Sequence, residues 1–273
     1  MMAVEPPMAL VARPGREMRT QSYVAGDYSG EFLQGERHGV GRFDYRNGNL
    51  YTGAWEHDRK HGFGMLRWSC GDTYTGEWRD NQMCGFGLFH YASGNTYNGQ
   101  FLADCKHGHG RFLWANGDVY DGEFVDDCME GMGTYTYHDH SQYVGEWKED
   151  LKHGQGTMKH SDQSVYDGEW FRNEKNGFGT LSYANGDRYV GTFRADLIDG
   201  EGLYNFKNRD SYNGQWEKGK MHGRGVYTWA NGNSYQGDFR KGKRDGQGIF
   251  RWSSGEVFDG FYFGDRRDGD GIY

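Results

Sequence analysis

The chain has 273 residues and a formal net charge of −8; 35% of its residues are hydrophobic and 17% are aromatic. The acidic balance disfavours nucleic acid and anionic membrane surfaces as main partners, because both attract basic patches. The sequence contains no apolar run close to the roughly 20 residues that span a membrane, and no signal-peptide core near its N-terminus. These features predict a cytoplasmic protein whose partners are other proteins.

Residues 1–25 differ from the rest of the chain. They contain all three prolines, Pro6, Pro7 and Pro14, and carry no repeated motif. We therefore expect a flexible N-terminal tail over residues 1–25, followed by one repeat array over residues 26–273. The alternative for part of the tail is a strand over Met18–Tyr23 that pairs with the first repeat.

A Tyr-x-Gly-x-aromatic motif organises the remaining chain. It recurs every 23 residues, eleven times, and a Gly-x-Gly follows eleven residues after each motif start. The motif starts are Tyr28, Tyr51, Tyr74, Tyr97, Tyr120, Tyr143, Tyr166, Tyr189, Tyr212, Tyr235 and Phe258. Self-similarity with a fixed period of this length indicates a repeat protein. Proteins of this class usually bind partners or have a structural role.

Each repeat is expected to form two strands. Tyr28, Gly30 and Phe32 are two residues apart, and Gly41 and Phe43 keep the same alternation in the second half of the repeat. Period two indicates strands. Two strands in each of eleven repeats, about 4.8 Å apart, predict a rod roughly 100 Å long. The recurrent glycines lie on the same face as the rings, so we expect each ring to lie flat over a glycine of a neighbouring strand.

Two kinds of connection join these strands. The first, such as residues 34–38, is polar and about five residues long. The second carries Asn-Gly pairs such as Asn47-Gly48, which favour a type I′ hairpin turn. In three repeats the glycine of this pair is replaced, and we expect altered turns there. The replacements are Asp139-His140, Asp162-Gln163 and Asn208-Arg209.

The pattern resembles the MORN repeat (membrane occupation and recognition nexus). The segments YTGEWRDNQMCGFG at Tyr74–Gly87 and NGDVYDGEF at Asn116–Phe124 carry the resemblance. It implies an all-β chain, folded as an elongated single-layer twisted antiparallel sheet of consecutive β-hairpins. It also implies a structural role, since similar proteins are cytoskeletal, ciliary, flagellar and junctional scaffolds.

The sequence offers no site for catalysis, a cofactor or a metal. Five histidines, among them His38 and His61, share one position just before the Gly-x-Gly, but neighbours there would be about 9.6 Å apart. Zinc–nitrogen bonds of about 2.0 Å need ligands much closer together. No helix follows a Gly-x-Gly to bind a phosphate. Cys105 and Cys128 are too far apart for a disulfide by the same spacing, as expected in a reducing compartment. We expect a protein that is not an enzyme.

The sheet face opposite the rings carries the candidate partner-binding residues. One row lies between the motif glycine and the aromatic residue and is often acidic; another lies between the paired glycines and is mostly apolar in the first seven repeats. Together they predict a mixed surface that binds a basic amphipathic segment of a partner. Its residues are Phe63, Phe86, Met132 and Phe178 beside Glu77, Glu123, Glu146 and Glu169.

A second candidate surface is the last repeat. Phe261 and Phe263 occupy positions that are often charged elsewhere in the array. Exposed strand edges pair readily with other chains. We expect self-association through the C-terminal edge, or pairing of that edge with a strand of a partner.

Three functions remain open from the sequence. The first is a structural scaffold that bridges proteins in a large assembly, cytoskeletal or in the axoneme of a cilium or flagellum, as the resemblance implies. The second is a membrane-associated adaptor that binds phosphoinositides, which the acidic charge of the array opposes. The third is a regulatory repeat subunit for an enzyme on another chain.

Overall fold

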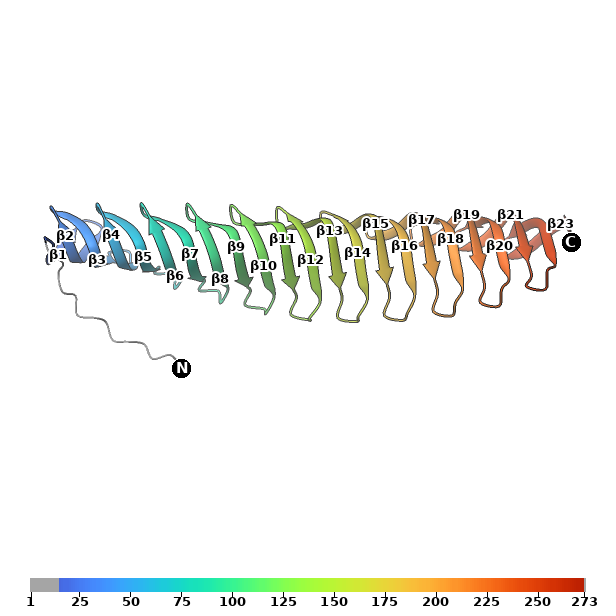
Figure 1. Cartoon of the computed structure of the whole chain (residues 1–273), viewed down its shortest axis with the longest axis horizontal. Helices are drawn as coiled ribbons and strands as arrows, with labels where there is room; N and C mark the ends of the chain where they lie inside the picture. Colours follow the sequence, from blue (N-terminus) through green and yellow to red (C-terminus); the bar gives the residue numbers. More distant parts are fainter. Residues whose placement is uncertain (1–14, 273) are drawn as a thin grey trace. The chain divides into compact units, whose positions relative to one another are not determined.

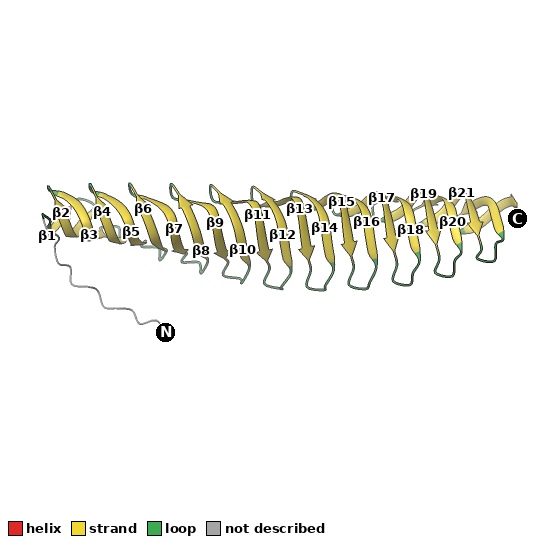
Figure 2. Cartoon of the chain, viewed as in Figure 1, coloured by secondary structure: helices red, strands yellow, loops and turns green. Residues whose placement is uncertain are grey.

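The computed structural model describes residues 15–272. All elements in this range are β-strands, joined by short turns (Figure 1, Figure 2). The chain divides into two compact units, an N-terminal unit that ends at Cys128 and a C-terminal unit that begins at Met129. Each unit is described separately below.

The N-terminal unit contains the first ten strands. They are β1 (Glu17–Tyr23), β2 (Gly26–Leu33), β3 (Glu36–Tyr45), β4 (Leu50–Glu56), β5 (Arg59–Arg67), β6 (Thr73–Arg79), β7 (Gln82–His90), β8 (Thr96–Leu102), β9 (Cys105–Leu113) and β10 (Val119–Val125).

The C-terminal unit contains the other strands. They are β11 (Cys128–Thr136), β12 (Gln142–Lys148), β13 (Leu151–Lys159), β14 (Val165–Phe171), β15 (Glu174–Ser182), β16 (Arg188–Arg194), β17 (Leu197–Asn205), β18 (Ser211–Glu217), β19 (Lys220–Thr228), β20 (Ser234–Arg240), β21 (Lys243–Arg251), β22 (Val257–Phe263) and β23 (Arg266–Ile272).

Within each unit, every strand pairs antiparallel with the strand before it and the strand after it in the chain (Figure 1). Each unit is thus an open antiparallel sheet of consecutive hairpins, which confirms the predicted all-β class. Paired glycines fix the register, for example Gly41 opposite Gly53 and Gly156 opposite Gly168. Chain neighbours are sheet neighbours, so all pairing is local.

The predicted N-terminal tail is wrong for residues 17–23. These residues form β1, which pairs with β2 from Glu17 opposite Phe32 to Tyr23 opposite Gly26. The alternative strand over Met18–Tyr23 is therefore present. Side chains support the pairing: the Thr20 and Ser29 hydroxyls are 2.9 Å apart, and the Arg19 guanidinium lies 4.1 Å from the centre of the Phe32 ring. Residues 1–14 of the expected tail lie outside the described residues.

The two kinds of connection differ in turn type, and the type I′ turn predicted for the Asn-Gly connection is wrong. The first is a two-residue turn in which both residues have positive φ, as at His57 (47°) and Asp58 (64°). This is the type I′ pattern. At the Asn47-Gly48 connection only the glycine has positive φ (86°), and its N–H donates to the Tyr45 carbonyl at 3.0 Å. That geometry is a type I turn followed by a left-handed glycine.

In ten repeats a β-bulge interrupts the pairing of the two strands at the Gly-x-Gly. Gly30 pairs with Gly41 and Phe32 with Arg37, so Glu31 alone faces the three residues 38–40. Gly39 has φ +72°, a left-handed conformation that disfavours other residues. The sequence pattern predicted an uninterrupted strand here. The first glycine of the pair is therefore required by the backbone conformation of the bulge and not by the packing of a ring.

The rings and the other two glycines form the core. All ten motif tyrosines are completely buried, and a Cβ atom on Gly156 would lie 2.6 Å from Cε2 of Tyr143. This confirms the predicted packing of rings over glycines. Each tyrosine hydroxyl also donates to the carbonyl of the residue three positions on, as from Tyr51 to Ala54 at 2.9 Å. Those carbonyls lie at the bulge, so tyrosine supplies a hydrogen bond there that phenylalanine lacks.

The three turns in which another residue replaces the glycine keep the common geometry. His140, Gln163 and Arg209 take the glycine position with φ of 68°, 76° and 74°. Each donates its backbone N–H to the residue three positions back, at 2.9–3.0 Å, like the glycines. The predicted altered turns are wrong, because the hydrogen bonds of the turn are maintained with a non-glycine residue in the left-handed region.

Candidate functional site

The candidate site is the sheet face opposite the rings, called here the outer face. It is defined by the central residues of the Gly-x-Gly motifs and their cross-strand partners. In the N-terminal unit, Phe63 and Phe86 project from β5 and β7 and are 65% and 62% exposed. Phe63 lies directly opposite Glu77, and Phe86 lies opposite Gln100. Val40 extends this apolar row on β3.

The C-terminal unit carries a matching group on its own outer face. Met132 (53% exposed) lies opposite Glu146, and Phe178 (57% exposed) lies opposite Thr192. Glu169 lies one strand before Phe178, opposite Gln155. The predicted apolar and acidic residues are thus neighbours within each unit. Glu123 lies in the N-terminal unit opposite His109, a polar neighbour, and adds charge there without an apolar cross-strand partner.

The acidic residues of this face have a structural role that the sequence analysis missed. The carboxylate of Glu77 accepts the backbone N–H of Phe86 at 3.0 Å, and that of Glu169 accepts the N–H of Phe178 at 2.8 Å. Both N–H groups lie at the bulge. Gln100 makes the same contact to the N–H of His109 at 2.8 Å. An uncharged amide oxygen therefore serves the bulge as well as a carboxylate does.

Glu31 departs from the other acidic residues of its row. Its side chain is buried, ion-paired with Arg16, and accepts the Val40 N–H at 3.2 Å. It is therefore excluded from the candidate surface. Glu77, Glu146 and Glu169 each keep one carboxylate oxygen bound to the sheet and are exposed. They can present negative charge to a partner while they hold the bulge.

The predicted C-terminal surface lies on β22. Phe261 and Phe263 are 56% and 65% exposed, opposite Gln247 on β21 and Arg266 on β23 respectively. Tyr262 between them is buried with the rings. These two phenylalanines are thus on the outer face of the C-terminal unit, like Phe178.

The ring face carries a row of cations that the sequence analysis also missed. They occupy one position of the repeat, one residue after the start of the second strand, and lie over the rings. Arg37 is 4.5 Å from the centre of the Trp55 ring, and Lys60 is 4.0 Å from that of Trp78. The row comprises Arg37, Lys60, Lys106, Lys152, Lys175, Arg244 and Arg267. The sequence signal was a basic residue recurring at a multiple of 23 residues.

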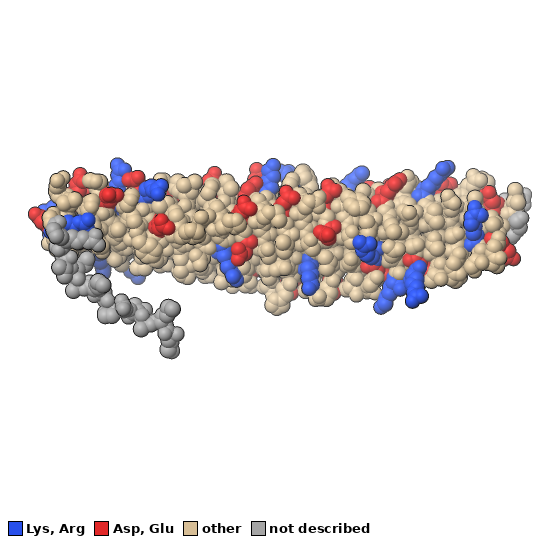
Figure 3. Space-filling model, in the orientation of Figure 1, with Lys and Arg blue, Asp and Glu red and all other residues tan. Residues whose placement is uncertain are grey.

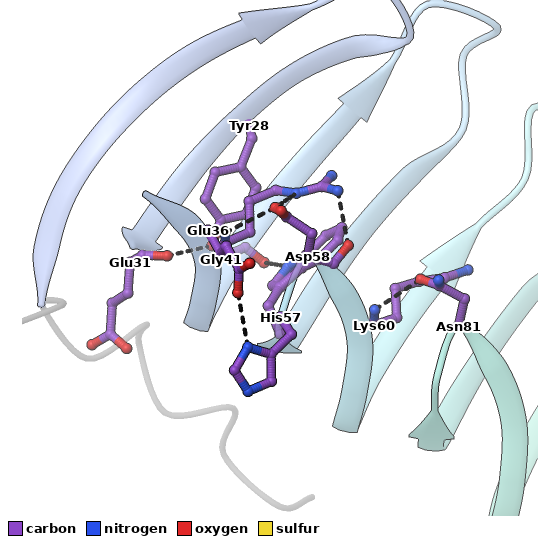
Figure 4. Close-up of polar contacts among 10 residues, drawn as sticks. Tyr28, Glu31, Glu36, Gly41, His57, Asp58, Lys60 and Asn81 are labelled. Atoms are coloured by element: carbon purple, nitrogen blue, oxygen red, sulfur yellow. Dashed lines mark hydrogen bonds and ion pairs between the residues drawn. The ribbon is translucent and has the colours of Figure 1, made fainter. Parts of the chain in front are cut away.

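An aspartate or asparagine of the next turn meets the cations of this row from Arg37 to Arg244. Asp58 accepts the Arg37 backbone N–H and binds its guanidinium, both at 2.9 Å (Figure 4). Burial alone would raise the pKa of Asp58, but the Arg37 N–H groups outweigh it and hold that pKa below its ordinary value. Much of the negative charge of the chain therefore stabilises turns. Figure 3 shows acidic and basic side chains interspersed among uncharged ones on the face in view.

No metal centre or membrane-spanning helix emerges from the described residues. Over residues 15–272, no three His, Cys, Asp or Glu side chains come together as metal ligands would. The same residues include no helix with the length and apolar character to cross a membrane. Three of the histidines before the Gly-x-Gly, His61, His107 and His222, lie near acidic side chains instead; His61 Nε2, for example, is 3.3 Å from Glu56.

Comparison with known sequences identifies the repeat. The sequence model of the MORN repeat matches ten successive segments, so the predicted count of eleven is not confirmed. The matched segments are residues 28–50, 51–73, 74–96, 97–119, 120–142, 143–165, 166–188, 189–211, 212–234 and 235–257. No curated protein sequence matches the chain significantly.

Among solved structures, two similar ones are TCP domains. The TCP10 domain of Danio rerio CPAP, in complex with a peptide of Danio rerio STIL, has a TM-score of 0.42 and 9% identity over 90% of this chain and 100% of that one. The SAS-4 TCP domain of Drosophila melanogaster, in complex with a proline-rich motif of Ana2, has a TM-score of 0.38 and 15% identity over 68% and 97%. TM-scores below 0.5 do not establish a common fold, so these proteins do not bear on the function of this chain.

Proposed function

This chain belongs to the MORN-repeat family, and we propose that it is a non-enzymatic scaffold that binds other proteins through the outer face of its sheet. The observation that supports the proposal most is the exposure of large apolar side chains on a face that the core does not use. Phe63 and Phe86 in one unit and Phe178 in the other are more than half exposed. Contiguous exposed apolar residues are typical of protein-binding surfaces.

The partner that fits this face is a basic amphipathic segment. Apolar side chains of such a segment would cover Phe63 and Phe86, and its lysines or arginines would meet Glu77 between them. In the C-terminal unit, Glu146 and Glu169 provide the same charge beside Met132 and Phe178. Opposite charges at the margin of an apolar contact increase the association rate and the specificity.

The cellular setting that we propose is a cytoskeletal assembly, with the axoneme of a cilium or flagellum as its most specific form. The resemblance to MORN scaffolds supports this setting. A fluorescent fusion of the full chain, viewed beside tubulin in the native source cells, tests it. Diffuse fluorescence that never overlaps a microtubule structure would contradict the assignment.

Self-association is a further element of the proposal. Phe261 and Phe263 present exposed aromatic surface on β22 of the C-terminal unit. Their replacement by serine should lower the weight-average mass of the purified chain in light scattering at high concentration. The same mass for wild type and variant over a concentration series would remove these residues from the proposal.

The outer face is tested by partner capture with matched variants. Phe63→Ser with Phe86→Ser, and Phe178→Ser separately, should each reduce recovery of the native partner roughly tenfold or more, because buried aromatic anchors dominate interfaces. The control is Leu102→Ser with Val125→Ser, which removes comparable exposed apolar surface at strand ends. Equal losses for both sets, or no loss for the phenylalanines, would overturn the proposal.

Charge is tested without damage to the bulge. Glu77, Glu146 and Glu169 become glutamine, a side chain that already makes the same backbone contact at Gln100 and Gln215. Capture should weaken and become less sensitive to salt, since surface charge pairs are screened. Unchanged capture at low salt would show that the partner is not recognised by its positive charge.

A further inference from the structure

We propose that Lys60 and Lys152, on the ring face, each bind a carboxylate of an acidic protein segment. The ring face is the face opposite the one used in the proposed function, so the two can be tested separately. The basis is a comparison among equivalent repeats of this chain. In four repeats the cation over the rings has a carboxylate partner in the next turn; at these two lysines it does not.

The paired cations define what the position requires. Lys106 Nζ is 3.1 Å from the Asp127 carboxylate, and Lys175 Nζ is 3.9 Å from that of Asp196. Arg244 meets Asp265 in the same way at 3.3 Å. In each case the aspartate also accepts the backbone N–H of the basic residue. The turn aspartate thus has two functions, one for the backbone and one for the charge.

Asn81 and Asn173 retain only the first of these functions. Asn81 Oδ1 accepts the Lys60 backbone N–H at 2.9 Å, as Figure 4 shows, and Asn173 accepts that of Lys152 at the same distance. The fold loses nothing by the change from aspartate to asparagine. What is lost is the negative charge, and neither lysine forms an ion pair with a described residue.

The surroundings hold each ammonium group in place. Lys60 Nζ lies 4.0 Å from the centre of the Trp78 ring and 5.7 Å from that of Tyr51. Lys152 Nζ lies 4.8 Å from Trp170 and donates to the Tyr137 hydroxyl at 3.4 Å. Burial lowers the pKa of Lys60 to about 8 and lowers that of Lys152 as well. An incoming carboxylate would relieve that cost, because it favours the charged form.

A protein carboxylate fits these positions better than a membrane does. Anionic lipid surfaces are bound by clusters of four to eight basic residues. These two lysines do not belong to such a cluster. In the repeat after Lys60 the same position is the buried Met83, and in the repeat after Lys152 it is Lys175, which is already paired with Asp196. Each ammonium group lies among tryptophan and tyrosine rings without an ion pair, although Asp104 attracts Lys60 and Asp196 attracts Lys152 at longer range. Such a cation suits one glutamate or aspartate with apolar neighbours.

The test uses the full chain and a glutamate-rich peptide that also contains leucine. The side-chain NMR signals of Lys60 and Lys152 should shift when the peptide is added. Lys60→Met should weaken peptide binding about tenfold, because one charge-assisted hydrogen bond is lost. Methionine occurs naturally at this position as Met83, so the variant keeps the fold. Asn81→Asp should weaken binding as much, because it supplies the carboxylate internally.

Three controls decide the outcome. Lys106→Met, which removes a paired lysine, and the pair Phe63→Ser with Phe86→Ser, on the outer face, should both leave peptide binding unchanged. The same peptide with glutamine for glutamate should not bind. Equal weakening by Lys106→Met, no effect of Asn81→Asp, or binding of the glutamine peptide would overturn the inference. So would Lys60-dependent binding to phosphatidylserine vesicles without binding to the peptide.

Discussion

At the scale of the residue, the stability of each unit depends on tyrosine rings that lie over glycines. A Cβ atom on Gly156 would lie 2.5 Å from Tyr143 Cζ, and the tyrosine is completely buried. Gly156→Ala should therefore raise the free energy of the folded state by about 3 kcal/mol. Hydrogen exchange should accelerate in β12 and β13 and remain unchanged in β2 to β5.

Gly35→Ala is the matched control. Gly35 has positive φ (88°), which Gly156 does not, and no atom lies within 4 Å of its added Cβ. Its substitution should cost only the left-handed conformation, about 1 kcal/mol. Equal costs at Gly35 and Gly156 would show that contact with the Tyr143 ring is not the main reason for glycine at position 156.

The acidic row makes a second residue-scale prediction. Glu77→Gln should leave stability within about 0.5 kcal/mol of wild type, because the amide oxygen can still accept the Phe86 N–H. Glu77→Ala should cost about 1 kcal/mol, since that N–H then loses its acceptor. Urea unfolding of the two variants measures the difference. If glutamine destabilised as much as alanine, the negative charge itself would be required.

The sequence predicted the faces of individual residues better than their contacts. Alternation placed Phe63, Phe86, Met132 and Phe178 on the exposed face, where the structure has them. It did not reveal that Glu77 binds a backbone N–H, because the bulge shifts the register and a period of two cannot represent that shift. The paired cations Arg37 and Lys106 were also missed, since their aspartate partners lie 21 residues later in the chain.

At the scale of the element, three turns contain a strained residue. His140, Gln163 and Arg209 have φ of 68–76° at a position that is glycine in most repeats. Replacement of each by glycine should stabilise its hairpin by about 1 kcal/mol, because the left-handed conformation costs a non-glycine residue about that much. Thermal unfolding of the three single variants measures this. Lys207→Gly, in the same turn as Arg209 but without positive φ, should not stabilise.

The hairpins show what sequence reasoning can and cannot do for elements. The 23-residue period and the alternation correctly predicted two strands per repeat. The turn type of the Asn-Gly connection was predicted wrongly, because Asn-Gly is common to type I′ turns and to type I turns with a left-handed glycine. Pairs such as Asp80-Asn81 adopt the type I′ conformation without glycine, and their side chains bind the neighbouring repeat instead.

At the scale of the whole molecule, the buried tyrosines make stability sensitive to alkaline pH. Burial raises the pKa of nine motif tyrosines, that of Tyr189 to about 12. The others are Tyr28, Tyr51, Tyr74, Tyr97, Tyr143, Tyr166, Tyr212 and Tyr235. A raised pKa means that the stabilisation is fully present below the unfolded value of about 10 and is lost as pH rises above it.

The chain should therefore unfold cooperatively between about pH 10 and pH 12. Over this range tyrosinate absorbance should increase as the β-strand signal in circular dichroism decreases. Below pH 10 neither signal should change. Tyrosinate that forms well before the strands are lost would show that the rings are accessible in the folded state.

The proposal that the outer face binds proteins concerns the molecule as a whole. Since each strand packs only on its chain neighbours, stability is a sum of local terms, and exposed positions of the array can be altered without unfolding it. Phe63 in one unit and Phe178 in the other can therefore be replaced by a photo-crosslinking phenylalanine analogue. Lys207 and Ser254, exposed turn residues, serve as controls.

Photo-crosslinking of the full chain in its native source cells tests this proposal most directly. A protein with a basic amphipathic segment should be crosslinked from Phe63 and Phe178 and not from Lys207 or Ser254, and the segment itself should carry the crosslink. Absence of a crosslinked protein at both phenylalanines, or the same products at the control positions, would contradict a partner-binding outer face.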